Sequence, residues 1–133
     1  MRVVLDTSVL IATDFDLPEA QVSVSSLSWA ELGFGLHKAR DPLERANREA
    51  RLARLRQLFG RGLPFDDAAA EVYTTICGLV LGVGTDPRPR AVDLMIAATA
   101  KAHGAAVATR NSKDLLGLEG FVRIIPAVTP QSD

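Results

Sequence analysis

The chain has 133 residues, of which 47% are hydrophobic and 23% charged, a composition typical of one globular domain and unlike that of a disordered protein. Cys77 is the only cysteine, which excludes an intramolecular disulfide, and no cluster of cysteine and histidine suits a zinc site. We therefore expect one domain over residues 1–133, with a polar tail from about residue 127, in the reducing cytoplasm. No stretch is long and apolar enough for a membrane span, and Asp6 comes too early for a signal peptide.

Basic residues gather in one segment, although the formal net charge is only −1. From Lys38 to Arg61, eight basic residues stand against three acidic ones, a local charge of +5. The segment is either a solvated helix face carrying ion pairs or a surface that binds phosphate groups, and the sequence leaves both interpretations open. On the second interpretation, the phosphate contacts come from Arg48, Arg51 and Arg54.

The first predicted elements are short. Residues 2–5 form an apolar run that predicts a buried strand, and Asp6 follows it as the cap of a helix start. Residues 22–25 predict a second strand. A helix is expected from Ser28 to about residue 39.

Residues 42–59 predict a long helix that ends at Gly60 and Gly62. Its apolar residues suggest an imperfect core-facing side opposite the arginines. The residues of that side are Leu43, Ala46, Ala50, Ala53, Leu55 and Leu58.

The second half of the chain alternates between strands and helices. In chain order, the predicted elements are a possible edge strand at 63–65, a helix over 68–81 capped by Asp66 or Asp67, a Gly/Pro-rich loop at 82–89, a helix from 91 or 92 to 103, a strand at 105–109, a short helical turn capped by Asn111, and a last strand at 121–125. This alternation predicts an α/β domain with a mostly parallel sheet of four or five strands, flanked by helices. In such sheets, ligands bind beyond the carboxyl ends of the strands, where the strand order reverses.

Four acidic residues are predicted near that edge. Asp6 and Asp114 follow predicted strands, whereas Glu31 and Asp93 fall in the first turns of helices that can begin there. Clustered carboxylates repel and raise one another's pKa values, so the arrangement makes sense mainly as a divalent-metal site. Oxygen ligands favour Mg²⁺ or Mn²⁺, and such ions activate water for phosphodiester hydrolysis.

Each acid also has a simpler explanation. Ser28-x-x-Glu31 fits a capping box, in which Glu31 only satisfies a backbone donor. Asp93 and Asp114 could complement helix dipoles. Asp6 is harder to explain in this way, because an acid at the end of a buried strand is costly unless it is paired, capped or metal-bound.

The local sequence around each acid is more specific than the spacing between the acids. The four segments, in chain order, are Val4-Leu5-Asp6-Thr7-Ser8-Val9-Leu10-Ile11, Ser28-Trp29-Ala30-Glu31-Leu32, Asp93-Leu94-Met95-Ile96-Ala97-Ala98-Thr99-Ala100 and Ala108-Thr109-Arg110-Asn111-Ser112-Lys113-Asp114-Leu115. They resemble the four acidic motifs of PIN-domain ribonucleases of the VapC type, the toxins of VapBC toxin–antitoxin pairs. The resemblance covers about residues 2–126 and implies a PIN-like three-layer fold.

The resemblance implies a function as well. It makes Asp6, Glu31, Asp93 and Asp114 the metal-site acids of an Mg²⁺- or Mn²⁺-dependent endoribonuclease; the supporting positions are Thr7, Thr109 and Asn111. It also implies structured RNA, such as tRNA or rRNA, as the substrate. The implied assembly is a homodimer of a type II toxin, inhibited by a small VapB-like antitoxin that inserts into the groove, and the arginines would then contact RNA.

Two departures from the family pattern are expected to matter. Only 24 residues separate Asp6 from Glu31, and residues 15–18 interrupt a region where members often have a longer helical hairpin, so the site should be open. Leu115 stands where an aromatic residue is common, a change that should affect packing more than chemistry.

Other enzyme classes fit less well. An aspartyl-nucleophile phosphatase requires a second acid where this chain has Ser8. A phospho-receiver domain requires an acidic pair before its acceptor and a lysine after a late strand, and neither is properly placed in this sequence. The remaining alternatives are an RNA-processing PIN nuclease that is not a toxin, and a non-catalytic PIN scaffold that binds RNA or protein. A scaffold normally lacks one or more acids, whereas all four are present here.

Overall fold

The computed structural model describes residues 1–12 and 19–127, which form a four-stranded parallel sheet in the order β2-β1-β3-β4. The strands are β1 (Arg2–Leu5), β2 (Gln21–Val24), β3 (Ala106–Thr109) and β4 (Ile124–Pro126). The predicted parallel sheet is thus confirmed. The interruption at 15–18, and the tail apart from residue 127, lie outside the described residues.

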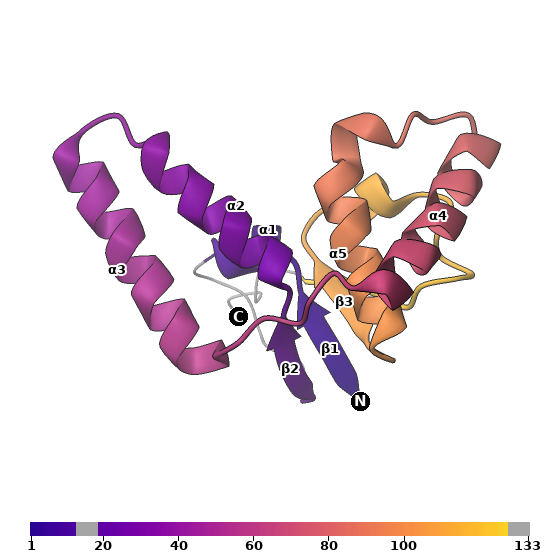
Figure 1. Cartoon of the computed structure of the whole chain (residues 1–133), viewed down its shortest axis with the longest axis horizontal. Coiled ribbons are helices and arrows are strands. Elements are labelled where there is room, and N and C mark those ends of the chain that lie inside the picture. Colours follow the sequence, from indigo (N-terminus) through magenta and orange to yellow (C-terminus); the bar gives the residue numbers. More distant parts are fainter. Residues whose placement is uncertain (13–18, 128–133) are drawn as a thin grey trace, which may run out of the picture.

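Helices cover both sides of the sheet (Figure 1). They are α1 (Thr7–Leu10), α2 (Ser26–His37), α3 (Pro42–Phe59), α4 (Asp67–Gly82) and α5 (Ala91–Ala102), with short 3₁₀ turns η1 (Arg88–Arg90) and η2 (Ser112–Leu115). The pair α2 and α3 lies on one side and the pair α4 and α5 on the other, as the expected three-layer arrangement requires. Across the described ranges, no helix combines the length and apolar character needed to cross a bilayer.

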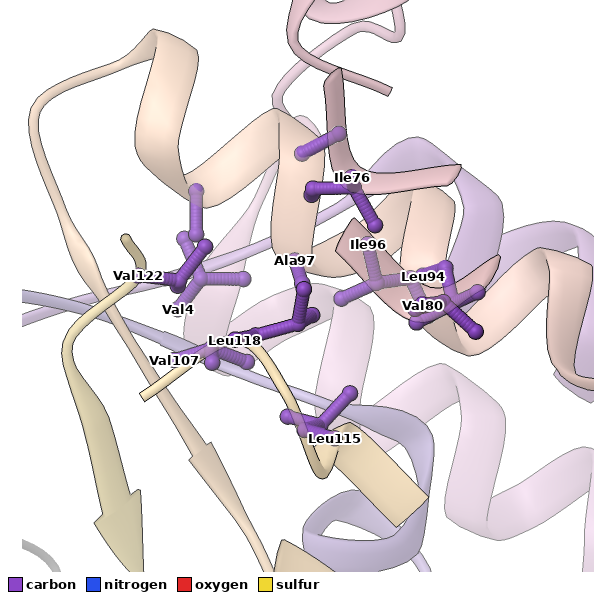
Figure 2. Close-up of a cluster of buried hydrophobic side chains, with 12 residues drawn as sticks. Val4, Ile76, Val80, Leu94, Ile96, Ala97, Val107, Leu115, Leu118 and Val122 are labelled. Atoms are coloured by element: carbon purple, nitrogen blue, oxygen red, sulfur yellow. The ribbon is translucent and has the colours of Figure 1, made fainter. Parts of the chain in front are cut away.

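The core has two halves because successive residues of a strand point to opposite faces. Val4 and Val107 pack with buried residues of α4 and α5, such as Ile76 (Figure 2). Val3 and Leu5 point the other way, into a second cluster that includes α1 and α2 residues. The central strands β1 and β3 are therefore buried on both faces, and the sheet is a rigid support for the residues at its edges.

The helix α2 begins earlier than predicted. Ser25 is its N-cap, with its hydroxyl accepting a hydrogen bond of 3.1 Å from the backbone N–H of Leu27. Ser28 and Glu31 consequently lie inside the helix, Glu31 beyond its first turn, so the capping-box interpretation and the first-turn placement of Glu31 are wrong.

Two predicted strands also differ. Residues 63–65 form only an isolated bridge between Leu63 and Ser25, because Pro64 has no N–H to continue a ladder. The last strand begins at Ile124 rather than residue 121, because the N–H groups of Phe121 and Val122 are used in a turn closed on the carbonyl of Leu118.

The predicted core-facing side of α3 is wrong. Leu43 and Leu58 are 72% and 74% exposed, whereas the contacts to the core come from Leu52, Leu55 and Phe59. Only Leu55 was on the predicted side. Among the arginines of α3, Arg48 and Arg51 are half-buried on the side that faces α2.

Candidate active site

The topology fixes where a ligand crevice can form. The chain passes from β1 to β2 on one side and later places β3 on the other side of β1, so the strand order reverses between β1 and β3. A crevice is expected beyond the carboxyl ends of these two strands. All four predicted acids lie at or near this edge.

Asp6 follows β1 directly and caps α1. Its side chain is 7% exposed, and its Oδ1 accepts hydrogen bonds from the Ser8 hydroxyl at 2.6 Å and from the Val9 N–H at 3.2 Å. The cap explains how a nearly buried carboxylate is tolerated at this position. Ser8 also accepts a bond of 3.0 Å from the Arg110 N–H, so one hydroxyl ties Asp6 to the residue after β3.

Glu31 reaches the same edge from α2. Its Oε1 accepts a hydrogen bond of 2.5 Å from the Thr7 hydroxyl, which lies 2.9 Å from the hydroxyl of Ser28. Because the Thr7 proton points to Glu31, Ser28 is the donor to Thr7. These hydrogen bonds hold Glu31 beside α1. They also give Thr7 the supporting contact that the family resemblance implied.

Asp93 lies in the first turn of α5, and its pKa reflects the negative charge of the site. Its pKa is raised from the ordinary value to about 6, first because burial disfavours the ionised carboxyl and then because Glu31, Asp6 and Asp114 place negative charge nearby. Arg90 acts in the opposite direction and lowers the pKa of Asp93. Glu31, Asp6 and Asp114 are therefore each within electrostatic reach of Asp93.

Asp114 enters from η2, beyond the end of β3. Arg90 Nη2 lies 3.6 Å from its Oδ1, in an ion pair whose side chains remain 40% and 30% exposed. Thr109 is buried and accepts a hydrogen bond of 3.0 Å on Oγ1 from the Asn111 N–H, which shapes the turn that carries Asp114. Ser8 and Arg90 also contact the acids, although the sequence gave neither of these two residues a role in this site.

Three of the acids share one small cavity. Its volume is about 20 Å³, enough for a single water-sized occupant. Its lining consists of Asp6, Ser8, Asp93, Thr109, Asn111, Asp114 and Leu115. Leu115 is also part of the buried core, which agrees with the packing role expected for it.

The oxygen donors of this cavity fit a hard divalent cation. Within residues 1–12 and 19–127, however, no three acidic, histidine or cysteine side chains form a ready-made cage for a metal ion. Mg²⁺ usually takes one or two protein carboxylates and keeps several water ligands, so a complete cage is not required. The mutual repulsion that raises the pKa of Asp93 is the effect that a bound cation would relieve.

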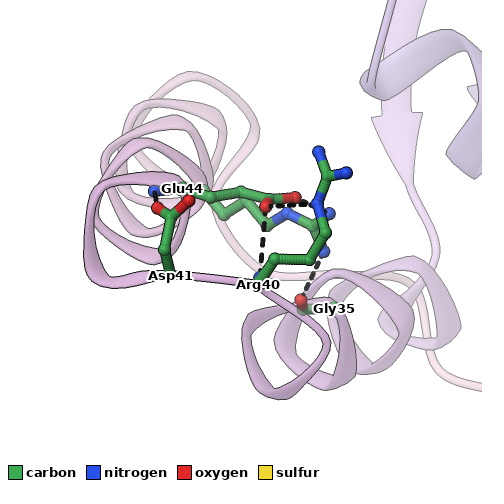
Figure 3. Close-up of polar contacts among 5 residues, drawn as sticks. Gly35, Arg40, Asp41 and Glu44 are labelled. Atoms are coloured by element: carbon green, nitrogen blue, oxygen red, sulfur yellow. Dashed lines mark hydrogen bonds and ion pairs between the residues drawn. The ribbon is translucent and has the colours of Figure 1, made fainter.

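A larger groove adjoins the acidic cavity between α2 and α3. Its volume is about 530 Å³, and it extends from Thr7 and Glu31 to Arg48 and Arg51. At the start of α3, Arg40 bonds Glu44 and Asp41 caps the helix (Figure 3), whereas the contact with Gly35 of α2 is made by Arg48.

The three predicted phosphate-contact arginines are not equivalent. Arg48 donates 2.6 Å hydrogen bonds to the Gly35 carbonyl and to Glu44, so it joins α3 to α2. Arg51 lines the groove and is half-buried, whereas Arg54 is exposed and outside the groove. The structure thus gives Arg48 an architectural contact that the sequence did not predict.

Comparison with known proteins identifies the class of this fold and site. Residues 3–116 match the family model for the PIN domain, and the chain belongs to the PIN-domain family. Comparison with curated proteins gave no significant match.

Solved structures narrow the relationship to the VapC type. A VapBC-5 member of the VapBC toxin–antitoxin family from Mycobacterium tuberculosis is 32% identical, with a TM-score of 0.81 over 94% of this chain and 98% of that one. FitAcB from Neisseria gonorrhoeae is 27% identical, with a TM-score of 0.71 over 92% and 96%. A DNA-bound VapBC from Salmonella typhimurium is 25% identical, with a TM-score of 0.65 over 95% and 98%. These matches confirm the resemblance to VapC-type PIN toxins.

Proposed function

We propose that this protein is an Mg²⁺- or Mn²⁺-dependent endoribonuclease that acts as the toxin of a type II toxin–antitoxin pair. The observation that carries the proposal is the convergence of Asp6, Asp93 and Asp114 on one small cavity, with Glu31 in electrostatic reach. PIN domains are generally nucleases, and family membership therefore supports the hydrolysis of phosphodiester bonds.

The residues have separable roles in this proposal. Asp6, Asp93 and Asp114 would hold the cation, with Glu31 completing the negative charge from the groove side. When bound, the cation supplies a charge that lowers the pKa of water and stabilises the phosphorane-like transition state. Ser8 and Thr7 orient Asp6 and Glu31 through the hydrogen bonds described above, and Thr109 and Asn111 support the turn that carries Asp114.

The substrate and partners are part of the same proposal. The adjoining groove brings Arg51 near the acids, so RNA phosphates could lie along it, with Arg54 and Arg48 as further candidate contacts. Structured RNA such as tRNA or rRNA is the proposed substrate. The VapBC relatives are toxin–antitoxin complexes, which supports a small VapB-like antitoxin as partner of this chain, and we extend the proposal to a homodimer.

A charge-neutral substitution tests the catalytic proposal directly. Asp93→Asn should abolish the cleavage of RNA in Mg²⁺ or Mn²⁺, because it removes one ligand oxygen charge while keeping the side-chain shape. Asp86→Asn is the matched control, since Asp86 is an exposed acid paired with Arg88 away from the acidic cavity. The measurement is the cleavage of radiolabelled tRNA and rRNA, with EDTA as the metal-free reference. Full activity of Asp93→Asn, or wild-type activity that survives EDTA, would contradict the proposal.

A further inference from the structure

A second cavity lies at the opposite edge of the sheet from the acids. Its volume is about 520 Å³, and it is situated where the strands begin rather than where they end. Arg2 opens β1, Arg123 directly precedes β4, and Lys101 comes from the last turn of α5. These three residues are referred to below as the basic pocket.

The cations of the basic pocket are held in place by uncharged groups. Lys101 Nζ donates a 2.8 Å hydrogen bond to the carbonyl of Phe121 and lies 4.5 Å from the centre of the Phe121 ring. Arg2 Nη1 donates a 3.0 Å hydrogen bond to the carbonyl of His103. A carbonyl or a ring orients a cation without cancelling its charge, so these side chains are ordered and remain positive.

No acidic side chain lines this cavity in the part of the chain that the structure describes. The ion pairs among the described residues involve other arginines, namely Arg40, Arg45, Arg48, Arg88 and Arg90. All three cations of the basic pocket are exposed. In a chain of net charge −1, three cations around one cavity, two of them oriented by backbone carbonyls, form a site for a group with concentrated negative charge.

We propose that the basic pocket binds phosphate groups of the RNA backbone at a distance from the cleavage site. The inference rests on the proposed nuclease function. A strand of four residues spans roughly 13 Å, so the two sites are separated by at least this distance and an RNA that occupies both must extend around the sheet. The pocket would then favour large, folded RNAs over short fragments, because only the former reach it while they occupy the acidic cavity.

Binding without metal separates this inference from catalysis. The probe is a fluorescently labelled transfer RNA, and its affinity is measured by anisotropy in EDTA at several salt concentrations. The test variant is Lys101→Gln with Arg123→Gln. Its control is Arg88→Gln, because Arg88 is exposed and lies outside both the basic pocket and the basic segment 38–61.

The expected result is specific to the pocket variant. Losing two phosphate contacts should flatten the salt dependence by about 0.7–0.9 slope units per contact. The same loss should weaken binding roughly three- to thirtyfold at low salt. The Arg88→Gln control should keep the wild-type slope. With Mn²⁺ present, the pocket variant should show a raised KM for transfer RNA and an unchanged kcat, and cleavage of a short oligoribonucleotide should not change.

Other outcomes overturn the inference in distinguishable ways. A pocket variant with the wild-type salt slope, or an Arg88→Gln control with an equal loss, removes the basic pocket from RNA binding while leaving the nuclease proposal intact. An equal loss of affinity for duplex DNA makes the pocket a general polyanion site and overturns the assignment to RNA. Arg123→Gln alone leaves the backbone hydrogen bonds of Lys101 and Arg2 in place, so it repeats the test if the double variant does not fold. A wild-type protein that neither binds nor cleaves RNA overturns both proposals.

Discussion

The Asp93 carboxyl is stabilised in its neutral form by the folded protein. Its pKa of about 6 lies above the ordinary value because burial and three neighbouring carboxylates disfavour its charge. The folded state therefore binds this proton more tightly than the unfolded state does. The resulting contribution to stability is fully present below the unfolded pKa, near pH 4, and is lost as the pH rises through about 6.

This sign makes a prediction for Asp93→Asn in the absence of metal. The variant should be more stable than wild type by about 1–2 kcal/mol at pH 7.5, after allowance for partial solvent screening. The difference should shrink as the pH falls from 6 to 4. Urea unfolding in EDTA, followed by circular dichroism at several pH values, measures it.

Asp86→Asn is the control for this pH profile. The pKa of Asp86 is lowered, first by its hydrogen bonds to the Arg88 side chain and backbone, so its linkage has the opposite sign. Removing this charge should not increase stability at neutral pH. If Asp93→Asn is no more stable than wild type in EDTA, the acids do not repel one another as the site geometry indicates.

At the scale of single residues, the sequence predicted which acids lie near one edge of the sheet, and the family resemblance named three supporting residues. It did not predict the contacts that Ser8 and Arg90 make with two of the acids. Asp6, Asp93 and Asp114 could be predicted because parallel strands and helix starts bring such residues to one edge of the sheet. The bond from Thr7 to Glu31 and the pairing of Arg90 with Asp114 depend on side-chain rotamers and on contacts between distant segments. No periodicity in the sequence encodes those details.

At the scale of elements, the position of α2 depends on a close backbone approach. The Leu63 N–H bonds the Val24 carbonyl, and the Ser26 N–H bonds the Leu63 carbonyl, so the chain after α3 clamps the start of α2. A Cβ atom on Gly62 would lie 2.5 Å from the backbone nitrogen of Ser26. Sequence analysis predicted Gly62 as a helix stop, whereas its contact shows that it is needed for this approach.

Gly62→Ala should therefore shift the start of α2 and destabilise the fold by about 1–3 kcal/mol, because backbone atoms cannot move aside as a flexible side chain can. Gly78→Ala is the control, since Gly78 lies inside α4 with no atom within 4 Å of the added Cβ. That change should be neutral or stabilising by up to about 1 kcal/mol. Thermal unfolding of both variants gives the comparison, and equal stability of the two would contradict the clamp.

The helix α3 shows why a correctly predicted element can be wrongly oriented. Its bounds matched the prediction, but of the leucines and alanines assigned to its core-facing side only Leu55 contacts the core. Leucine and arginine both have long aliphatic stems, so the apolar pattern of a helix with many arginines discriminates its faces poorly. The partners of Arg48 on α2 decide the orientation, and they are known only once the two helices are packed.

At the scale of the whole molecule, exposed apolar residues occur in several regions, two of which bear on the binding of a partner. Ile11 and Phe34, 49% and 62% exposed, belong to α1, its end and α2. Leu81 and Leu116, each 60% exposed, lie at the end of α4 and after η2. Ile11 lines the groove that leads to Glu31, whereas Leu81 does not. A partner that blocks the acidic site is expected in the first region.

The proposed antitoxin should combine an apolar segment with an arginine. The segment would contact the groove lined by Ile11, and the arginine would pair with Glu31 and compete with the cation. Expression of the chain alone should arrest bacterial growth, and co-expression of the adjacent upstream reading frame should relieve the arrest.

Ile11→Ser should weaken that partner's binding roughly tenfold, since it truncates one apolar anchor in the groove. Leu81→Ser is the control of similar exposure outside the groove and should leave relief unchanged. Growth curves with isothermal titration of the purified pair measure both effects. Equal loss in both variants would place the partner elsewhere, and absence of toxicity together with no binding partner would favour an RNA-processing nuclease over a toxin.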